Sequence, residues 1–404
     1  MNYVAMAIPF FILALLVEFL YGLLRRRNTY RLADTINSLQ LGVLSRLRGL
    51  ISLGLVGFSF HALTNGWTLL DIDGSDPVLW AAAFVAYDLC YYFSHRFGHE
   101  WRILWASHVV HHSSEAFNLS TALRQTSTGW LNGIFYLPMY AIGVPLEVML
   151  SVGSLNLIYQ FWVHTEHIRR LGWLEWVLVT PSNHRVHHAK NPCYIDRNYG
   201  GVFIVWDRLF GTFQDEMDTE PCRYGITRQL NSWNPLWANI HVWYEGLGAT
   251  RQTPRLWDKF RLWFKSPAWS PPGIAESELD WRAADFDPPS SRYARGWAFV
   301  QFWIHTAASL TLLQQASIMP DNNVTLLLLW LVSGLVLQGM ALEGRSRIAL
   351  WELARVAAGT ALVVITAPLA QHTLYAFGYL AISAAAVLPL ATRSHGKAIP
   401  KGWT

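Results

Sequence analysis

Recurring apolar runs of about 20 residues constrain the fold of this chain more than any other feature. A helix that crosses the hydrocarbon core of a bilayer needs about 20 predominantly apolar residues. The runs that approach this length are 5–24, 49–70, 78–94, 130–144, 146–163, 297–316, 324–341, 348–368 and 373–391. Only 14% of the 404 residues are charged, whereas soluble domains average about 25%. The sequence therefore predicts an all-α, multi-pass membrane protein with about seven to nine spans, the lower number applying if 130–163 is a re-entrant hairpin.

Basic residues between these runs predict the orientation in the membrane. Segment 25–48 contains six Arg, whereas 71–77 contains three Asp and no basic residue. Loop 342–347 and the C-terminal tail are basic again. Because cytoplasmic loops carry the excess of Lys and Arg, we expect the N-terminus outside and the C-terminus inside. The preference for Arg (26) over Lys (5) favours a bacterial inner membrane, or the endoplasmic reticulum if the source is eukaryotic.

Polarity divides the chain into four predicted parts. These are N-terminal spans (1–77), a histidine-rich domain (78–215), a cytoplasmic or interfacial connector (216–296) and a C-terminal four-span region (297–404). Within the connector, segment 255–265 is amphipathic, with aromatic and aliphatic residues on one helical face and basic residues on much of the other. This pattern is typical of a helix that lies in the membrane interface, although a helix that packs against a core has the same pattern.

Histidine is concentrated in one part of the chain. Ten of the 15 histidines fall between residues 95 and 188, in four clusters: His95 and His99; His108, His111 and His112; His164 and His167; His184, His187 and His188. Residues spaced i, i+3 and i+4 share a helix face. Each cluster follows or lies close to the cytoplasmic end of a predicted span, so we expect all four to meet at that membrane face.

Imidazole is the commonest metal ligand among side chains, and this constellation offers more rings than one tetrahedral ion needs. We expect two metal ions with positions left open for oxygen, a site that favours iron. The predicted ligands are His95, His99, His108, His111, His112, His164, His184, His187 and His188. His167 is either a tenth ligand or a hydrogen-bond partner of one. Zinc also accepts imidazole, and a set of hydrogen-bonded histidines at helix ends is the structural alternative.

Nearby carboxylates are candidates for offsetting the charge of two cations. The candidate catalytic residues are Asp88, Glu100, Glu115 and Glu166, and Asp196 is a further candidate partner of a ligand. Each lies close in sequence to a histidine cluster. Each is equally explained as a helix-end or loop carboxylate that faces water. Asn118, Arg124 and Gln125 are interpreted either as binding a pterin or a lipid headgroup or as capping a loop.

Five stretches lie within the histidine-rich domain: YDLCYYFSHRFGHE (87–100), HHSSEAFNLSTALRQ (111–125), YQFWVHTE (159–166), TPSNHRVHHAKNPCYIDRNYGG (180–201) and WDRLFGTF (206–213). They resemble the fatty acid hydroxylase and sterol desaturase superfamily, and within it the alkylglycerol monooxygenase branch. The resemblance implies two Fe ions held by the nine histidines, with tetrahydrobiopterin or another external reductant and O2. It also implies that an ether lipid is hydroxylated next to its ether oxygen and breaks into glycerol and a fatty aldehyde.

Two other functions remain open from the sequence alone. A sterol or fatty-acyl desaturase or hydroxylase would share the histidines and differ in its lipid pocket. A membrane metal-binding or transport protein would be expected to place ionisable residues in mid-span, whereas these histidines lie at span ends. The chain has no glycine fingerprint for a flavin or a nicotinamide nucleotide, so electrons must come from an external donor. Its net charge of +4 is too small to indicate nucleic acid, and the expected partner is a lipid from the bilayer.

Overall fold

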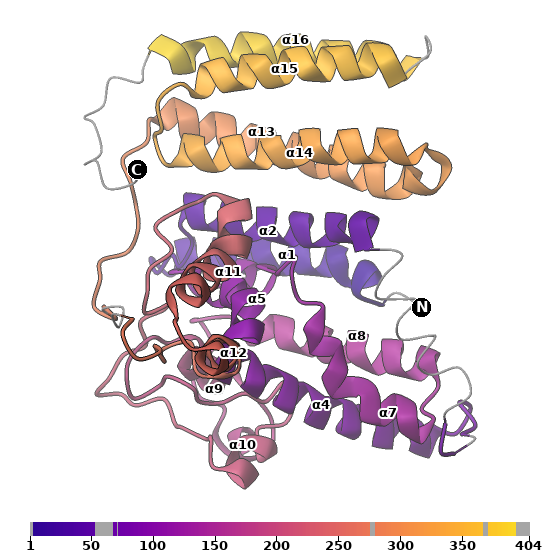
Figure 1. Cartoon of the computed structure of the whole chain (residues 1–404), viewed down its shortest axis with the longest axis vertical. Coiled ribbons are helices and arrows are strands. Elements are labelled where there is room, and N and C mark those ends of the chain that lie inside the picture. The colour runs from indigo at the N-terminus through magenta and orange to yellow at the C-terminus, as the bar shows by residue number, and fades with distance from the viewer. Residues whose placement is uncertain (1–2, 53–67, 71, 275–278, 367–370, 393–404) are drawn as a thin grey trace. The chain divides into compact units, whose positions relative to one another are not determined.

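The computed structural model describes residues 3–52, 68–70, 72–274, 279–366 and 371–392 (Figure 1). Within these ranges the regular structure is helical, and strand-like pairing is limited to two isolated bridges, Leu178–Phe203 and Ala189–Tyr224. The predicted all-α fold is confirmed for this part of the chain. The chain divides into two compact units, one formed by 1–31, 52–230 and 239–284 and the other by 32–51, 231–238 and 285–404.

The first unit contains every histidine cluster. Its helices are α1 (Tyr3–Leu24), α4 (Pro77–Glu100), α5 (Arg102–His112), α6 (Leu119–Ala122), η1 (Leu131–Tyr136), α7 (Leu137–Ile142), α8 (Leu146–Trp162), η2 (Gly172–Trp176), α9 (Pro181–His188), α10 (Val205–Phe210), most of α11 (Pro235–Gln252) and α12 (Leu256–Phe264). Helix α4 packs against α5 and α8, and α1 packs against α8 (Figure 1). Apolar side chains from α4, α7 and α8 form one core cluster around Ala83, Met139 and Val148. This packing brings the histidine-bearing ends of α4, α5 and α8 together.

The second unit is built from α2 (Leu32–Ser52), α13 (Arg292–Gln315), η3 (Ala316–Ile318), α14 (Asp321–Leu342), α15 (Ile348–Thr366) and α16 (Gln371–Thr392). Each of α13 to α15 packs against the next helix in the chain, which gives the two hairpins seen in Figure 1. Ile36 of α2 is buried in the same cluster as Trp297 and Ala298 of α13. Helix α2 was not predicted, because 25–48 has no long apolar run and resembles a basic loop between spans. Polar and apolar residues are mixed among the buried positions of this helix.

Most of the predicted spans coincide with helices. By length and composition, α1 (over Met6–Leu24) and α14 (over Asp321–Leu342) are long and apolar enough to cross a membrane. The predicted span 130–144 is a broken helix, because η1 is followed by the short α7, which ends at Gly143 with φ +109°. Most of the predicted span 49–70 lies outside the described residues. The number of crossings therefore stays a prediction.

Candidate metal centre

Four segments position the histidines, and two of them, α4 and α9, begin with a clear helix-start signal. Helix α4 begins where the Asp76 carboxylate accepts the Val78 N–H at 2.8 Å, with Pro77 in the first turn. It carries His95 and His99 at its far end, immediately before α5. Helix α9 begins with a proline after Thr180, and all eight of its residues are buried. The structure therefore places three of the four clusters on helices, and the remaining one directly after α8.

The nine predicted ligands come together in two groups. The first group contains five rings (His95, His99, His108, His112 and His187), and the second contains four (His111, His164, His184 and His188). Within each group, one candidate ligand atom from each residue lies within 4.8 Å of every other. His167 belongs to neither group. The structure thus brings together the whole predicted ligand set and leaves the doubtful tenth residue outside it.

Helices α5 and α9 each contribute to both groups. On α5 the pair spaced i, i+4 (His108 and His112) belongs to the five-histidine group, and His111 belongs to the other. On α9 the pair His184 and His188 belongs to the four-histidine group, and His187 to the other. Successive residues are about 100° apart around a helix, so the middle histidine of each triplet points away from the second of the pair. The two groups therefore share two rigid helices.

The ring nitrogens that face inward are close to one another. In the five-histidine group, Nε2 of His108 lies 2.9 Å from Nε2 of His95 and 3.0 Å from Nε2 of His112. In the four-histidine group, Nε2 of His184 lies 3.0 Å from Nε2 of His164 and 3.1 Å from Nε2 of His188. Two nitrogen ligands about 2.1 Å from one ion, at an angle of about 90–100°, are separated by about 3.0–3.2 Å. The spacing is that of ligands around a shared cation.

The outward-facing nitrogens show which tautomer the rings adopt. Nδ1 of His111 lies 3.1 Å from the carbonyl oxygen of Arg124, and Nδ1 of His164 lies 2.8 Å from that of Gln160. A carbonyl accepts only, so each Nδ1 carries the proton and each Nε2 presents a lone pair. These two Nε2 atoms are 3.2 Å apart with no proton between them. Such a contact is repulsive unless a cation lies between the lone pairs, so the residues fit a metal ion.

The same outward contacts occur in the five-histidine group. Nδ1 of His95 lies 2.7 Å from the carbonyl oxygen of Tyr199, and Nδ1 of His187 lies 3.0 Å from that of Arg197. Nε2 of His187 is buried and has no hydrogen-bond partner among the residues that the structure describes. Backbone carbonyls thus orient rings in both groups. These partners could not be predicted from the sequence, because any residue type offers a carbonyl and only the tertiary fold places it.

Burial favours the neutral form of eight of the nine rings. It lowers the pKa of His95, His108, His112, His164, His184, His187 and His188 well below the ordinary 6.5, and neighbouring imidazoles lower it further. It also lowers the pKa of His111 to about 4. A neutral ring is the form that binds a metal ion. The centre is therefore available to a cation throughout the physiological pH range.

These pKa values predict the acid limit of metal retention. Protons compete for folded His111 only as the pH falls toward 4, so we expect this ligand to hold its metal ion at pH 6 and to release it between about pH 5 and 4. In the unfolded chain the histidine pKa is near 6.5, so between pH 6.5 and 4 the unfolded chain binds more protons than the folded protein. The metal-free protein therefore becomes less stable as the pH falls through this range. Metal content after equilibration at pH 7, 6, 5 and 4 measures the effect. A release midpoint at pH 6 or above would contradict it.

The five candidate carboxylates lie in different surroundings. Asp196 approaches a ligand, with Oδ1 3.7 Å from Nδ1 of His99. Glu100 pairs with Arg96 at 2.9 Å, Glu115 with Arg31 at 3.7 Å, and Glu166 with Arg27 at 3.3 Å. None of these three belongs to either metal group. Of the five, Asp196 is therefore the one whose described contacts include a predicted ligand.

Asp88 holds the loop that orients a histidine. Its buried carboxylate accepts the N–H groups of Val202 (2.8 Å) and Phe203 (3.0 Å), and also hydrogen bonds from Trp206 and Asn156. A Cβ at Gly201 would lie 2.8 Å from this carboxylate, so the loop requires glycine there. The loop begins at Tyr199, whose carbonyl faces His95.

Asp207 fixes the same loop from its other side. Its buried carboxylate accepts the N–H groups of Tyr199 and Gly200, each at 2.7 Å, and the hydroxyl of Thr212 at 2.7 Å. Burial raises the pKa of Asp207 to about 6. The sequence YGG at 199–201 thus lies between two buried carboxylates, which explains why it contains two glycines.

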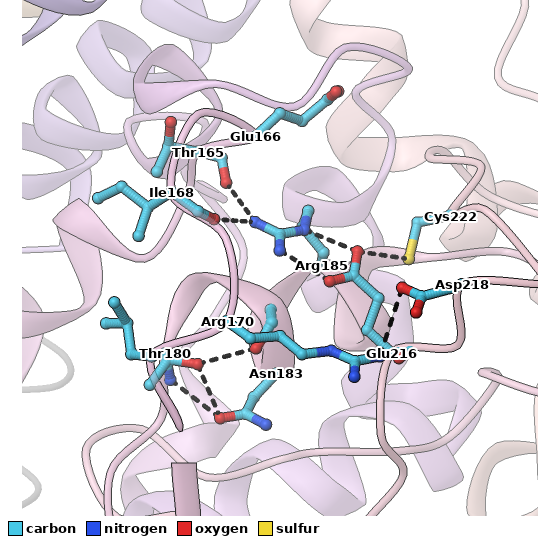
Figure 2. Close-up of polar contacts among 12 residues, drawn as sticks. Thr165, Glu166, Ile168, Arg170, Thr180, Asn183, Arg185, Glu216, Asp218 and Cys222 are labelled. Carbon is cyan, nitrogen blue, oxygen red and sulfur yellow. Dashed lines mark hydrogen bonds and ion pairs between the residues drawn. The ribbon is translucent and has the colours of Figure 1, made fainter. Parts of the chain in front are cut away.

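Arg185 connects α9 to the segment that follows His164 (Figure 2). Its Nη1 donates to the carbonyl oxygens of Thr165 (3.0 Å) and Ile168 (2.7 Å). Its Nε and Nη2 form a two-point ion pair with Glu216, at 2.8 and 2.7 Å. The guanidinium lies on the same short helix as three ligands, so it holds His164 in place relative to them.

We expect Arg185→Met to lower the free energy of unfolding by about 3 kcal/mol, because it leaves a largely buried carboxylate and two carbonyls without their partner. Arg170→Met is a matched control, since Arg170 contacts the same region but its ion pair with Asp218 is solvent-exposed. That substitution should cost less than about 1 kcal/mol. Denaturation of both variants in detergent measures the difference. Equal losses would show that Arg185 does not hold the centre together.

The polar residues of 118–125 act as caps. Asn118 accepts the Ser120 N–H at 3.0 Å and donates to the Thr29 carbonyl at 2.9 Å. The buried Arg124 donates from Nε to the Val110 carbonyl at 2.9 Å, at the end of α5. Gln125 donates to the carbonyl of Ala122. Their described contacts support the capping interpretation rather than the binding of a pterin or headgroup.

Comparison with known proteins decides the family. The chain is 36% identical to alkylglycerol monooxygenase of Homo sapiens over 365 residues, covering 88% of this chain and 81% of the relative. It is 35% identical to the Danio rerio enzyme over 88% of this chain and 80% of that relative. The chain belongs to the alkylglycerol monooxygenase family. Like other alkylglycerol monooxygenases, it is an oxidoreductase, and the transport alternative is set aside.

The histidine-rich part of the chain is also similar to proteins outside the alkylglycerol monooxygenases. The Fatty acid hydroxylase family model matches residues 80–212, the region that contains all nine histidines. An ornithine lipid hydroxylase of Rhizobium tropici is 31% identical over 147 residues, which cover 34% of this chain. No solved structure gives a significant match. The chain is thus similar, over part of its length, to a hydroxylase of another lipid as well as to alkylglycerol monooxygenases.

Proposed function

We propose that this chain is a membrane-bound di-iron monooxygenase that hydroxylates the carbon next to the ether oxygen of an alkylglycerol. The observation that carries this proposal is the convergence of nine imidazoles in two groups, in a chain similar to alkylglycerol monooxygenases along most of its length. The five-histidine and four-histidine groups would each hold one iron ion. Iron bound there would supply the activation of O2.

The reaction balances with one external two-electron donor. One atom of O2 enters the C–H bond next to the ether oxygen, and the other leaves as water with two electrons and two protons from the donor. The resulting hemiacetal breaks its C–O bond to give glycerol and a fatty aldehyde. We propose tetrahydrobiopterin, or another external reductant, as the donor.

The lipid substrate requires a site that opens to the bilayer. We propose seven to nine crossings, with the histidines on the cytoplasmic side of a bacterial inner membrane. The apolar helices α1 and α14 and the arginine-rich segment 25–48 support this topology. The match of the family model over 80–212 supports a histidine domain at 78–215, followed by the connector 216–296.

Fatty aldehyde release tests the proposal. Membranes that contain the protein are incubated with a 1-O-alkylglycerol, a reduced pterin and O2, with His187→Ala as the control. We expect aldehyde that depends on the pterin and on the intact histidine. An iron-loaded sample that releases no aldehyde would contradict ether cleavage. It would favour hydroxylation of another membrane lipid, the second candidate supported by the similarity to the ornithine lipid hydroxylase.

A further inference from the structure

Helix α12 presents a row of large apolar side chains to the exterior. Leu256, Trp257, Phe260 and Phe264 are 81%, 66%, 54% and 39% exposed. Their spacing (i, i+1, i+4, i+8) places them on one face of the helix. Isolated exposed apolar residues need no explanation, but a contiguous patch of this kind marks an interaction surface.

The opposite side of α12 attaches the helix to its own unit. Leu262 and Asp258 are buried. Trp263 stacks on Trp243 with ring centroids 5.7 Å apart and donates to the hydroxyl of Thr250 at 3.1 Å. The sequence pattern left open whether the apolar residues of 255–265 face a core. Leu262 and Trp263 make that packing, and the ring of Phe264 meets Trp101 edge-on at 5.7 Å between centroids. Leu256, Trp257 and Phe260 are each more than half exposed.

The charge around this apolar row is positive. Segment 251–270 contains five basic residues (Arg251, Arg255, Lys259, Arg261 and Lys265) and a single acid, Asp258. The acid forms an ion pair with Arg261 at 3.1 Å. Aromatic residues on one face with Lys and Arg beside them are typical of a helix that lies in the plane of an anionic membrane surface.

We propose that α12 is an in-plane membrane anchor that binds the anionic phospholipid headgroups of the leaflet next to the metal centre. Trp257 and Phe260 insert at the boundary of headgroups and acyl chains. Lys259 and Lys265 extend along the apolar surface and place their ammonium groups at the phosphates. The partner is a lipid surface rather than a protein, because the row is narrow, aromatic and flanked by basic residues.

The anchor is joined to a ligand-bearing helix. The N–H of Arg102, the first residue of α5, donates to the Lys265 carbonyl at 3.0 Å. The Arg102 side chain donates to the carbonyls of Pro267 (2.8 Å) and Trp269 (2.7 Å). His108 lies six residues further along α5, about 9 Å away. Insertion of α12 therefore sets the depth of the metal ligands relative to the leaflet.

Spin-label depth measurements test the anchor without requiring turnover, so their failure would leave the proposed reaction untouched. In a full-length background with Cys90, Cys193 and Cys222 replaced by serine, a nitroxide is attached at Trp257→Cys or Phe260→Cys. Asp218→Cys, at a fully solvated surface position, is the control. The protein is reconstituted in phosphatidylcholine vesicles with or without phosphatidylglycerol, and collisions with O2 and with a water-soluble nickel chelate are compared.

We expect the O2-to-nickel collision ratio at 257 and 260 to be several-fold higher than at 218, and higher still with phosphatidylglycerol. Adding Lys259→Gln and Lys265→Gln should remove the effect of phosphatidylglycerol. Ratios equal to that at 218 would overturn the proposal. Labels shielded from both reagents would also overturn it, because they would show that α12 is covered by protein.

Discussion

His184→Ala is expected to lower turnover at least about 100-fold and to reduce bound iron from about two ions to about one per chain. His184 lies in the group of four ligands, and its Nε2 is 3.0 Å from Nε2 of His164 and 3.1 Å from Nε2 of His188. Removing a partner that only orients a ligand already costs about 10- to 100-fold in metal affinity or activity. Loss of one of four ligands should cost more. Elemental analysis and aldehyde release measure the two effects.

His167→Ala is the matched control for this substitution. His167 is part of the third histidine cluster in the sequence, but its ring lies outside both groups and packs against Tyr21, with ring centroids 5.2 Å apart. We expect this variant to keep both iron ions and most of its turnover. If it loses iron as His184→Ala does, His167 is a tenth ligand. If His184→Ala keeps its full activity, the assignment of the four-histidine group is wrong.

Asp88→Ala is expected to lower the free energy of unfolding by about 4 kcal/mol or more. The carboxylate satisfies two backbone N–H groups and the side chains of Trp206 and Asn156. A buried donor left without a partner costs about 1–3 kcal/mol. The loss should also displace the Tyr199 carbonyl that orients His95. Thermal unfolding in detergent, together with iron content, measures the change.

Glu100→Ala is the matched control on the same helix. Glu100 forms a partly exposed i, i+4 pair with Arg96, which contributes about 0.3–0.5 kcal/mol. A loss well below 1 kcal/mol is expected. A stable Asp88→Ala protein that has lost activity would instead indicate that Asp88 takes part in the chemistry. This comparison separates the positioning role of Asp88 from the catalytic role that its place in the sequence suggests.

Histidine spacing was sufficient to predict which nine rings come together, for a physical reason. Ligands spaced i, i+3 and i+4 share one side of a helix, so the sequence encodes which rings can meet once the helices pack. The division into two groups was not predicted. It depends on the rotation of α5 and α9 about their axes, which direct His111 and His187 away from their neighbours. The rotation of a helix about its axis is determined by how it packs, so histidine spacing alone does not predict which group each ring faces.

The surroundings of the ligands were harder to predict. The carbonyls of Arg124, Gln160 and Arg197 orient rings through the backbone, and no side-chain pattern identifies them. Asp196 and Asn198 have positive φ values of 60° and 56°, and they bracket the carbonyl of Arg197. Asp and Asn tolerate this conformation better than most residues. The sequence IDRNYGG (195–201) therefore indicates a turn, but it does not indicate which histidine ring the carbonyl in that turn contacts.

The number of iron ions in the wild-type protein tests the central claim most directly. Full-length protein purified in detergent at pH 7, loaded with ferrous iron and freed of excess metal, is analysed for iron and for protein. The arrangement of five and four histidines predicts about two iron ions per chain. A folded protein that retains one ion or none would contradict the two-metal centre on which the proposed function depends.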